Sequence, residues 1–124
     1  MSKNIAEQFV EILVKAGIKR IYAVTGDSLN FLNDAIKREG SIQWIHVRHE
    51  EVGAFAAAAE AELDGLAVCA GSSGPGHVHL INGLYEANRG NVPVLAIAST
   101  CESSEFGTSY FQETNTIKLF DDCS

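Results

Sequence analysis

The segment WIHVRHEEVGAFAAAAEAEL, residues 44–63, joins a short apolar run directly to an alanine-rich run. The first run predicts a parallel β-strand covered by helices on both faces, because apolar residues occupy both of its sides. These residues are Ile42, Trp44, Ile45 and Val47. The second run has helical spacing, and its small alanines favour close packing against a sheet. The residues expected on the inner face of this helix are Val52, Phe55, Ala56 and Ala59.

Glu50 lies where the predicted strand ends and the predicted helix begins. In open α/β sheets, ligand-contacting groups are placed at this edge. Two uses of the carboxylate agree with the position: Glu50 contacts a ligand, or Glu50 and Glu51 only complement the positive end of the helix dipole. Arg48 and His49, which precede Glu50, either tune its ionisation or are solvated turn residues.

The composition is that of a globular protein, with 46% hydrophobic and 20% charged residues in a chain of 124. This length predicts one domain, residues 1–124, with a true hydrophobic core. The formal net charge is -7, and basic residues do not run beyond pairs such as Lys19-Arg20. Neither nucleic acid nor an anionic membrane is therefore expected as a partner.

The chain is expected to be cytoplasmic. Its first residues, MSKNIAEQFVEILVKAG, predict an amphipathic helix rather than a secretory signal. Its apolar runs are all shorter than the roughly 20 residues that a membrane-spanning helix needs. Three cysteines, Cys69, Cys101 and Cys123, lack C-x-x-C spacing, which favours free thiols, and Cys69 is expected in the core.

The residues before this segment predict a helix, a strand and a second helix. The first helix spans about 5–16, with Asn4 as its cap and Gly17 at its end. A strand over 21–24 leads into the turn Thr25-Gly26-Asp27-Ser28, whose Asp or Ser is expected to cap the next helix. That helix runs through Lys37 and ends at Gly40; its inner residues are Leu32, Ala35 and Ile36.

The residues after this segment continue the alternation of strand and helix. A third strand over 66–70 is followed by the glycine-rich loop 71–76 and by a helix over about 77–88. The inner residues of that helix are expected to be Val78, Ile81, Leu84 and Tyr85. A fourth strand spans 92–98, and a polar segment leads to a helical turn over about 115–120. The pattern predicts an α/β fold: an open parallel sheet of at least four strands with helices on both faces.

In such a sheet all four strand-to-helix loops open on one edge, which brings residues 25–28, 48–50, 71–76 and 99–112 together. The glycine loop is neither a P-loop nor a dinucleotide fingerprint, since no Gly-Lys-Ser/Thr follows and Pro75 removes a donor. It either brings backbone close to a flat ligand or is only a tight turn. Tyr110 and Phe111 either line a pocket at this edge or seal the core beneath the last helix.

His77 and His79 are two residues apart at a predicted helix start, so their side chains point about 200° apart. A metal ion shared by the two is therefore not expected, and capping or surface roles are favoured.

Four segments together resemble the amino-terminal, pyrimidine-binding domain of thiamine-diphosphate enzymes. They are VTGDS at 24–28, RHEE at 48–51, SSGPG at 72–76 followed by Asn82-Gly83-Leu84, and YFQET at 110–114. Within that family the chain most resembles pyruvate oxidase and pyruvate:quinone oxidoreductase. The resemblance extends over essentially the whole chain.

The resemblance implies that Glu50 is the catalytic carboxylate that activates thiamine diphosphate. Such a carboxylate favours the imino tautomer of the aminopyrimidine, which then takes the proton from the thiazolium carbon. The implied cofactor-binding residues are Gly26, Asp27, Glu50, Ser73, Gly74, Pro75, Gly76 and Asn82, and the implied substrate-side residues are Phe111 and Gln112. The implied substrate is pyruvate or another 2-oxo acid, which the parent enzyme decarboxylates oxidatively.

Two departures concern single positions: Thr25 stands where many relatives have proline, and His79 where they have asparagine. Residues 99–112 lack the paired histidines of the simple decarboxylases, which argues against that branch. Acetolactate synthase, with a similar FQE segment, remains an alternative, as does a non-catalytic oligomerisation module with the same fold.

Family subunits also have a central domain and a second thiamine domain with a Gly-Asp-Gly motif, which this chain lacks. The chain is therefore expected to be a fragment, incomplete at its C-terminal end and inactive alone. By the same resemblance, Mg²⁺ and FAD belong to the parent enzyme and are bound outside this chain, which itself supplies no metal ligand. Same-type subunits are the expected partners, and a peripheral membrane or quinone contact is expected only in the full-length enzyme.

Overall fold

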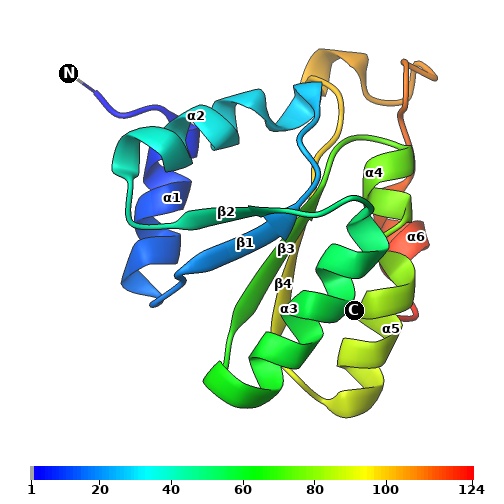
Figure 1. Ribbon diagram of the computed structural model, residues 1–124. Coiled ribbons are helices and arrows are strands. Elements are labelled where there is room, and N and C mark those ends of the chain that lie inside the picture. The colour runs from blue at the N-terminus through cyan, green and yellow to red at the C-terminus, as the bar shows by residue number, and fades with distance from the viewer. Residues whose placement is uncertain (1) are drawn as a thin grey trace.

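The computed structural model describes residues 2–124, which form a four-stranded parallel sheet in the order β2-β1-β3-β4 (Figure 1). The strands are β1 (Arg20–Ala23), β2 (Gln43–His46), β3 (Ala67–Gly71) and β4 (Val94–Ala98). The helices are α1 (Ile5–Lys15), α2 (Asn30–Glu39), α3 (Glu50–Asp64), α4 (Pro75–Val78), α5 (Ile81–Gly90) and α6 (Thr116–Phe120). Two short 3-10 turns, η1 (Asp27–Leu29) and η2 (Ser103–Glu105), lie in the loops after β1 and β4. The predicted fold class is confirmed.

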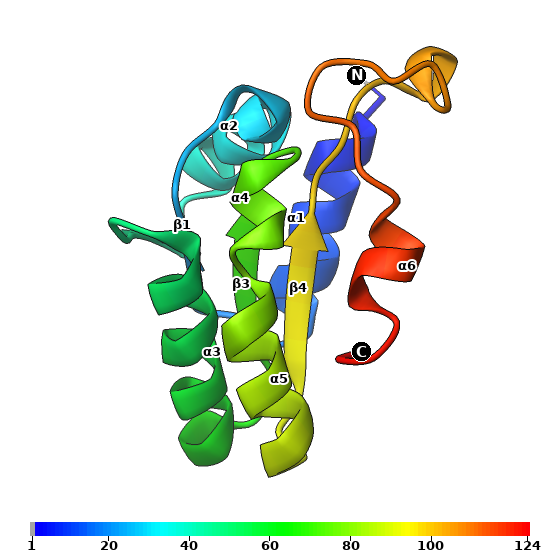
Figure 2. The same ribbon diagram turned by 90° about the vertical axis from the view of Figure 1, so that its right-hand side faces the viewer.

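The helices form one layer on each face of the sheet, with α1 and α2 on one side and α3 to α6 on the other (Figures 1 and 2). Each layer encloses its own core. Strand β3 contributes to both, because its successive side chains point to opposite faces: Val68 and Ala70 face α1 and α2, whereas Ala67 and Cys69 face α3 and α5. Cys69 is fully buried as predicted, and burial raises the pKa of its thiol to about 12.

The predicted ends of the first helices are confirmed in part. Asn4 caps α1 in a capping box with Glu7, and Gly40 ends α2 in the left-handed conformation. The predicted cap by Asp27 or Ser28 is wrong, because neither side chain makes a capping hydrogen bond to η1 or α2. The Ser28 hydroxyl instead bonds to residues of other loops.

Strand β2 is an edge strand, and its side chains are less buried than the prediction of a strand covered on both faces requires. Gln43 and His46 are exposed, and Trp44 and Ile45 are only partly buried. The sequence did not reveal this edge position, because an edge strand and a central strand can have equally apolar sequences.

The inner face of α3 also differs from the prediction. Val52 and Phe55 are 54% and 42% exposed, and Ala56 and Ala59 are not buried either. The buried residues of the helix are Glu50, Gly53, Ala54, Ala57, Ala58 and Ala61. Small residues face inward because α3 packs closely on β1 and α5: a Cβ on Gly53 would lie 3.2 Å from the Tyr22 carbonyl oxygen.

The predicted helix over 77–88 is divided into α4 and α5. His79 and Leu80 separate the two, and Leu80 is fully buried. Of the predicted inner face, Leu84 is buried, whereas Val78, Ile81 and Tyr85 are only partly buried. Within residues 2–124, every helix is too short or too polar to cross a membrane.

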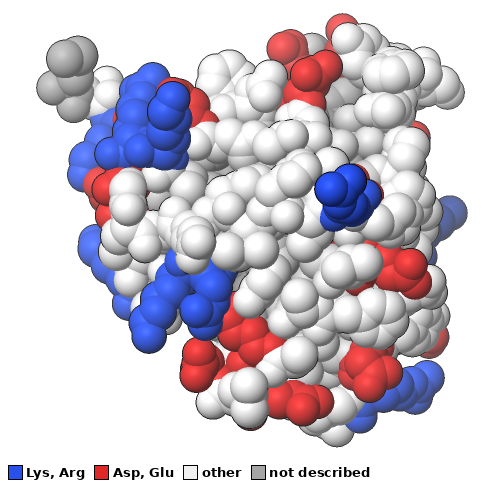
Figure 3. All heavy atoms as spheres, viewed as in Figure 1, with Lys and Arg blue, Asp and Glu red and all other residues white. Residues whose placement is uncertain are grey.

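Figure 3 shows how charge is distributed on one face of the described molecule. Basic side chains gather over α1 and α2 at the left, and acidic side chains gather toward the bottom, where α3 and α5 end. At the lower left the basic and acidic side chains adjoin, and the middle of this face is largely uncharged.

Candidate functional site

Hydrogen bonds join the loops that follow β1, β3 and β4 at one edge of the sheet. The Ser28 hydroxyl lies 2.6 Å from the Ser99 hydroxyl and accepts a hydrogen bond from the Ser73 amide at 2.9 Å. The Ser73 hydroxyl donates to Gln112 Oε1 at 3.2 Å, and the Ser99 hydroxyl donates to the Gly71 carbonyl at 3.3 Å. The prediction that these loops meet is therefore confirmed.

A cleft of about 770 Å³ lies among these loops. Five of the predicted site residues line it: Gly26, Asp27, Ser73, Phe111 and Gln112. The cleft opens between the ends of β1 and β3, where the strand order reverses, and this is the position at which open α/β sheets bind ligands.

Tyr110 and Phe111 belong to this cleft rather than to the core. Their exposed fractions are 49% and 76%, so they do not seal the core beneath α6. Of the two alternatives left open by the sequence, the structure supports the pocket lining.

Glu50 is the first residue of α3 and is buried, with 11% of its side chain exposed. Its Oε2 accepts a hydrogen bond from His79 Nδ1 at 3.0 Å, which requires the proton of His79 to lie on that nitrogen. Its Oε1 faces the glycine turn, because a Cβ on Gly76 would lie only 3.3 Å away. Glu50 therefore lies beside the serine-glycine turn, although it is not among the residues that line the cleft near Phe111.

The glycine loop depends on the absence of side chains. A Cβ on Gly71 would lie 2.6 Å from backbone atoms of Gly76 and His77, and a Cβ on Gly26 would lie 2.4 Å from Ser72 Cβ. Gly74 has a positive φ of 63° and lies against Gln112, whose Cβ would be 2.8 Å from an added Cβ. The loops thus approach one another more closely than any residue with a side chain would allow.

The remaining predicted site residues lie apart from the cleft. Pro75 is the exposed first residue of α4, and Asn82 Nδ2 donates to Glu51 Oε1 at 2.6 Å. Asn82 therefore supports the turn that carries Glu50. The hydrogen bond to Glu50 itself comes from His79.

The predicted capping or surface role of His77 is wrong, because its side chain is fully buried. Its Nδ1 donates to the Ser99 carbonyl at 2.8 Å, and its Nε2 accepts from the Thr114 hydroxyl. Burial lowers the pKa of His77, and the hydrogen bond to Ser99 opposes this shift in part. A histidine two residues from His79 on a short helix gave no sign in the sequence that it would cross-link β4 to the segment after Gln112.

The sequence left His49 either as a residue that tunes Glu50 or as a solvated turn residue, and it favoured a capping or surface role for His79. Both side chains are half-exposed, and they also contact each other. Their rings are stacked with centroids 4.3 Å apart, and His49 caps α3 by accepting from the Glu51 amide at 3.3 Å. His77 takes no part in this pair, since its ring packs edge-on against Phe120 instead.

A family model for the thiamine pyrophosphate enzyme, N-terminal TPP binding domain, matches residues 3–119. The chain belongs to this family. Thiamine pyrophosphate is thiamine diphosphate, so the resemblance noted in the sequence is confirmed at the level of the family and of its N-terminal domain.

The relatives of this TPP binding domain include an uncharacterized protein and two kinds of enzyme. An uncharacterized 42.6 kDa protein of Pseudomonas amyloderamosa is 60% identical over 122 residues, 98% of this chain and 31% of that protein. Pyruvate oxidase of Lactiplantibacillus plantarum is 44% identical over 115 residues, 91% of this chain and 19% of that protein. Chloroplastic acetolactate synthase of Arabidopsis thaliana is 34% identical over 115 residues, 92% of this chain and 17% of that protein. The TPP binding domain thus spans less than a third of the length of each of these relatives.

The residues around Glu50 fit the pyrimidine half of the cofactor. The carboxylate is buried, one of its oxygens is held by His79, and the other faces a turn that carries no side chain at Gly76. Such an oxygen suits the ring nitrogen of a flat heteroaromatic group. Mg²⁺ does not fit the same place, because it prefers an octahedron of oxygen ligands and two of the three neighbouring donors are imidazoles.

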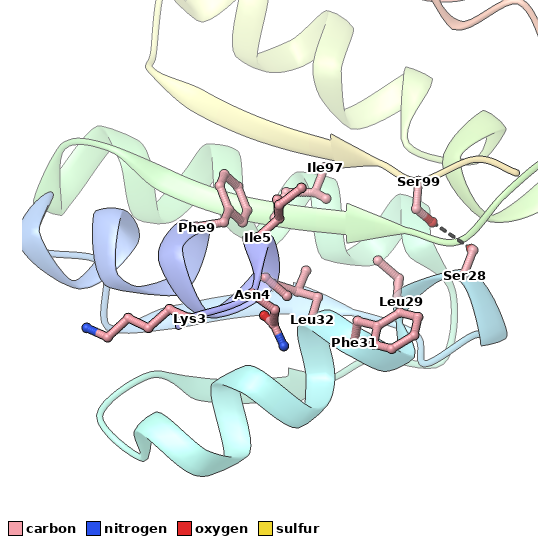
Figure 4. Close-up of a pocket in the computed structure, with 11 residues that line it drawn as sticks. Lys3, Asn4, Ile5, Phe9, Ser28, Leu29, Phe31, Leu32, Ile97 and Ser99 are labelled. Atoms are coloured by element: carbon pink, nitrogen blue, oxygen red, sulfur yellow. Dashed lines mark hydrogen bonds between the residues drawn. The ribbon is translucent and has the colours of Figure 1, made fainter. Parts of the chain in front are cut away.

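A second hollow, of about 660 Å³, lies on the other side of the Ser28–Ser99 hydrogen bond, between α1, α2 and β4 (Figure 4). Most of its lining is apolar, with Ile5, Phe9, Phe31 and Ile97 around it. It holds none of the residues that the resemblance assigns to the cofactor or substrate.

Proposed function

We propose that this chain is the cofactor-activating domain of a thiamine-diphosphate-dependent pyruvate oxidase or pyruvate dehydrogenase (quinone). The observation that carries the proposal is the buried carboxylate of Glu50, held by His79 on one oxygen and open toward the glycine turn on the other. Pyruvate oxidase is also a relative at 44% identity.

In this proposal Glu50 accepts a hydrogen bond from a protonated ring nitrogen of the pyrimidine and stabilises that protonation state. His79 orients the carboxylate, and α3 holds it in a buried place where the hydrogen bond is stronger than in water. When bound, thiamine diphosphate supplies a nucleophilic carbon for attack on a 2-oxo acid. Phe111 and Gln112 line the side of the cleft from which the substrate approaches.

The properties of the whole enzyme form a second part of the proposal. We propose that Mg²⁺ and FAD are held by regions that the longer relatives have in addition, and that same-type subunits complete the active site. The chain alone is then inactive, and the enzyme is cytoplasmic. The proposals on cofactors, subunits and activity follow from the resemblance and from the small share of each relative that the chain spans. The proposed location rests on the free cysteines.

Glu50→Gln in the enzyme that contains this chain tests the central proposal. Glutamine keeps the shape of the side chain but cannot stabilise a protonated pyrimidine, so pyruvate turnover should fall by roughly 10²–10⁴-fold. Glu51→Gln is the matched control, because Glu51 shares the first turn of α3 and its contribution to the helix dipole. Unchanged turnover in Glu50→Gln, or equal losses in both variants, would show that Glu50 has no catalytic role beyond the dipole, as in a non-catalytic module.

The alternative is the same domain of an acetolactate synthase, which the Arabidopsis relative supports. The two activities differ in their products. Both release carbon dioxide from one pyruvate, but an oxidase then passes two electrons to an acceptor, whereas acetolactate synthase joins the remaining two-carbon unit to a second pyruvate. Acceptor reduction with no acetolactate formed from pyruvate supports the oxidase, and the converse result favours the synthase.

A further inference from the structure

His49, Glu50 and His79 form the one group of the described residues that could hold a metal ion. We propose that this group binds a divalent transition-metal ion such as Zn²⁺, with one ring nitrogen from each histidine and one oxygen from Glu50. The three ligand atoms come from the start of α3 and from the junction of α4 and α5, and all lie within 4.8 Å of one another.

The distances require only a small rearrangement. Tetrahedral Zn²⁺ with bonds of about 2.0–2.1 Å holds its ligand atoms roughly 3.4 Å apart. His79 Nδ1 and Glu50 Oε2 are already 3.0 Å apart. The two imidazoles must move to bring the other ligand atoms closer. The side chains of His49 and His79 are 45% and 41% exposed and therefore have room to turn.

The donor set determines the class of metal. Two imidazoles and one carboxylate suit Zn²⁺, Co²⁺ and Ni²⁺, whereas Mg²⁺ and Ca²⁺ prefer oxygen ligands throughout. The solvent-exposed side of the histidines leaves further positions for water. The helix dipole at the start of α3 opposes a cation there, but the carboxylates of Glu50 and Glu51 offset it.

Binding of the metal has a consequence for the site that rests on the proposed function. If Glu50 Oε1 serves the pyrimidine ring, a metal ion bound to Oε2 would draw charge from the carboxylate and weaken the hydrogen bond that Oε1 accepts. A transition metal would then inhibit cofactor activation. Metal binding itself does not depend on the proposed role of Glu50 in cofactor activation, so it can be measured without thiamine diphosphate.

The experiment is calorimetric titration of this chain with Zn²⁺ at pH 7.5, repeated with Co²⁺ and visible absorption. All proteins carry Cys101→Ser, which removes the free cysteine that is not buried. His49→Asn and His79→Asn are the test variants; asparagine preserves the helix cap at residue 49. His46→Asn is the control, because His46 is exposed on β2 outside the group.

Each test variant should raise the dissociation constant at least about tenfold, since even outer-shell partners of a metal change its affinity by roughly 10–100-fold. The control should bind like the parent. Equal affinity in all four proteins, or no binding by the parent, would overturn the proposal.

A measurement on the unsubstituted protein keeps the test decisive if a variant fails to fold. Zn²⁺ should shift the imidazole NMR signals of His49 and His79 and leave those of His46 and the buried His77 in place. Shifts at His46 alone, or at none of the histidines, would count against the site.

Discussion

His77 is a fully buried imidazole that joins the end of β4 to the segment after Gln112. In its neutral form the ring donates through Nδ1 and accepts through Nε2, so both nitrogens are used. A second proton on the ring would force the Thr114 hydroxyl to turn away and would place a charge in a buried site. The lowered pKa of His77 reflects the cost of placing a charge in a buried site.

Stability should therefore depend on pH through this residue. Because the pKa of His77 is lower in the folded chain, the unfolded chain binds the proton first as the pH falls. The free energy of unfolding is highest above the ordinary histidine value of about 6.5 and decreases below it, until the pH passes the lowered pKa of the folded chain. Urea unfolding between pH 7.5 and pH 5 measures this slope.

His77→Gln should have a shallower slope than the parent over the same range, although its stability at pH 7.5 is lower. His46→Gln, which changes an exposed histidine of β2, should keep the parent's slope. Parallel curves for the parent and His77→Gln would contradict the assignment of this pH dependence to His77.

Helices α3 and α5 pack closely through small residues on both sides. A Cβ on Gly83 would lie 2.4 Å from Ala54 Cβ and 2.6 Å from backbone atoms of Ala54 and Phe55. Backbone cannot turn away as a flexible side chain can, so any larger residue would push the two helices apart. This contact also fixes the start of α3, which carries Glu50.

Gly83→Ala should lower the free energy of unfolding by about 1–3 kcal/mol, the usual cost of overpacking. Gly90→Ala in the same helix is the matched control, because an added Cβ there would come no closer than 3.9 Å to its neighbours. That control should be neutral or more stable by up to roughly 1 kcal/mol, through helix propensity. Equal effects of the two substitutions in urea unfolding would contradict the close packing.

The opposite side of α3 carries Val52, Phe55 and Leu63, all of them exposed. The larger apolar residues thus lie outside and the alanines inside. Hydrophobicity alone would bury Val52, Phe55 and Leu63 and expose the alanines. Because α5 and β1 approach α3 closely, the side of the helix with the small residues is buried instead.

At the edge of the sheet where the loops after β1, β3 and β4 meet, hydroxyl groups from distant parts of the chain hold the molecule together. Ser28 is the central one, since it bonds to Ser99 and to the amide of Ser73, 71 and 45 residues away in sequence. These bonds also separate the edge cleft from the apolar hollow between α1, α2 and β4.

Ser28→Ala should lower the free energy of unfolding by about 1–3 kcal/mol, because the Ser73 amide loses its acceptor in a partly buried place. Hydrogen exchange at that amide should become faster than in the parent. Ser41→Ala, at an exposed serine bonded only within its own turn, should change stability by less than about 0.5 kcal/mol. An unchanged exchange rate at Ser73 would mean that the hydroxyl does not hold the loop.

Local pattern was enough to identify the order of the elements, the parallel sheet and the edge at which the loops meet. Helical and strand periodicity, the Asn4 cap and the Gly40 end depend on neighbours in sequence. The four motifs that resemble thiamine-diphosphate enzymes are likewise short segments, and the family model that matches residues 3–119 confirms what they indicated.

Only the tertiary structure decided which strands are neighbours, which face of α3 is buried and where His77 lies. The sequence of a strand does not state its partner, so the edge position of β2 and the reversal between β1 and β3 emerged only in the folded sheet. Close contacts such as Gly83 on Ala54 and Ser28 on Ser99 join residues far apart in the chain. The pairing of Glu50 with His79 is of the same kind, because it exists only when α3 packs against α5 and the junction that precedes α5.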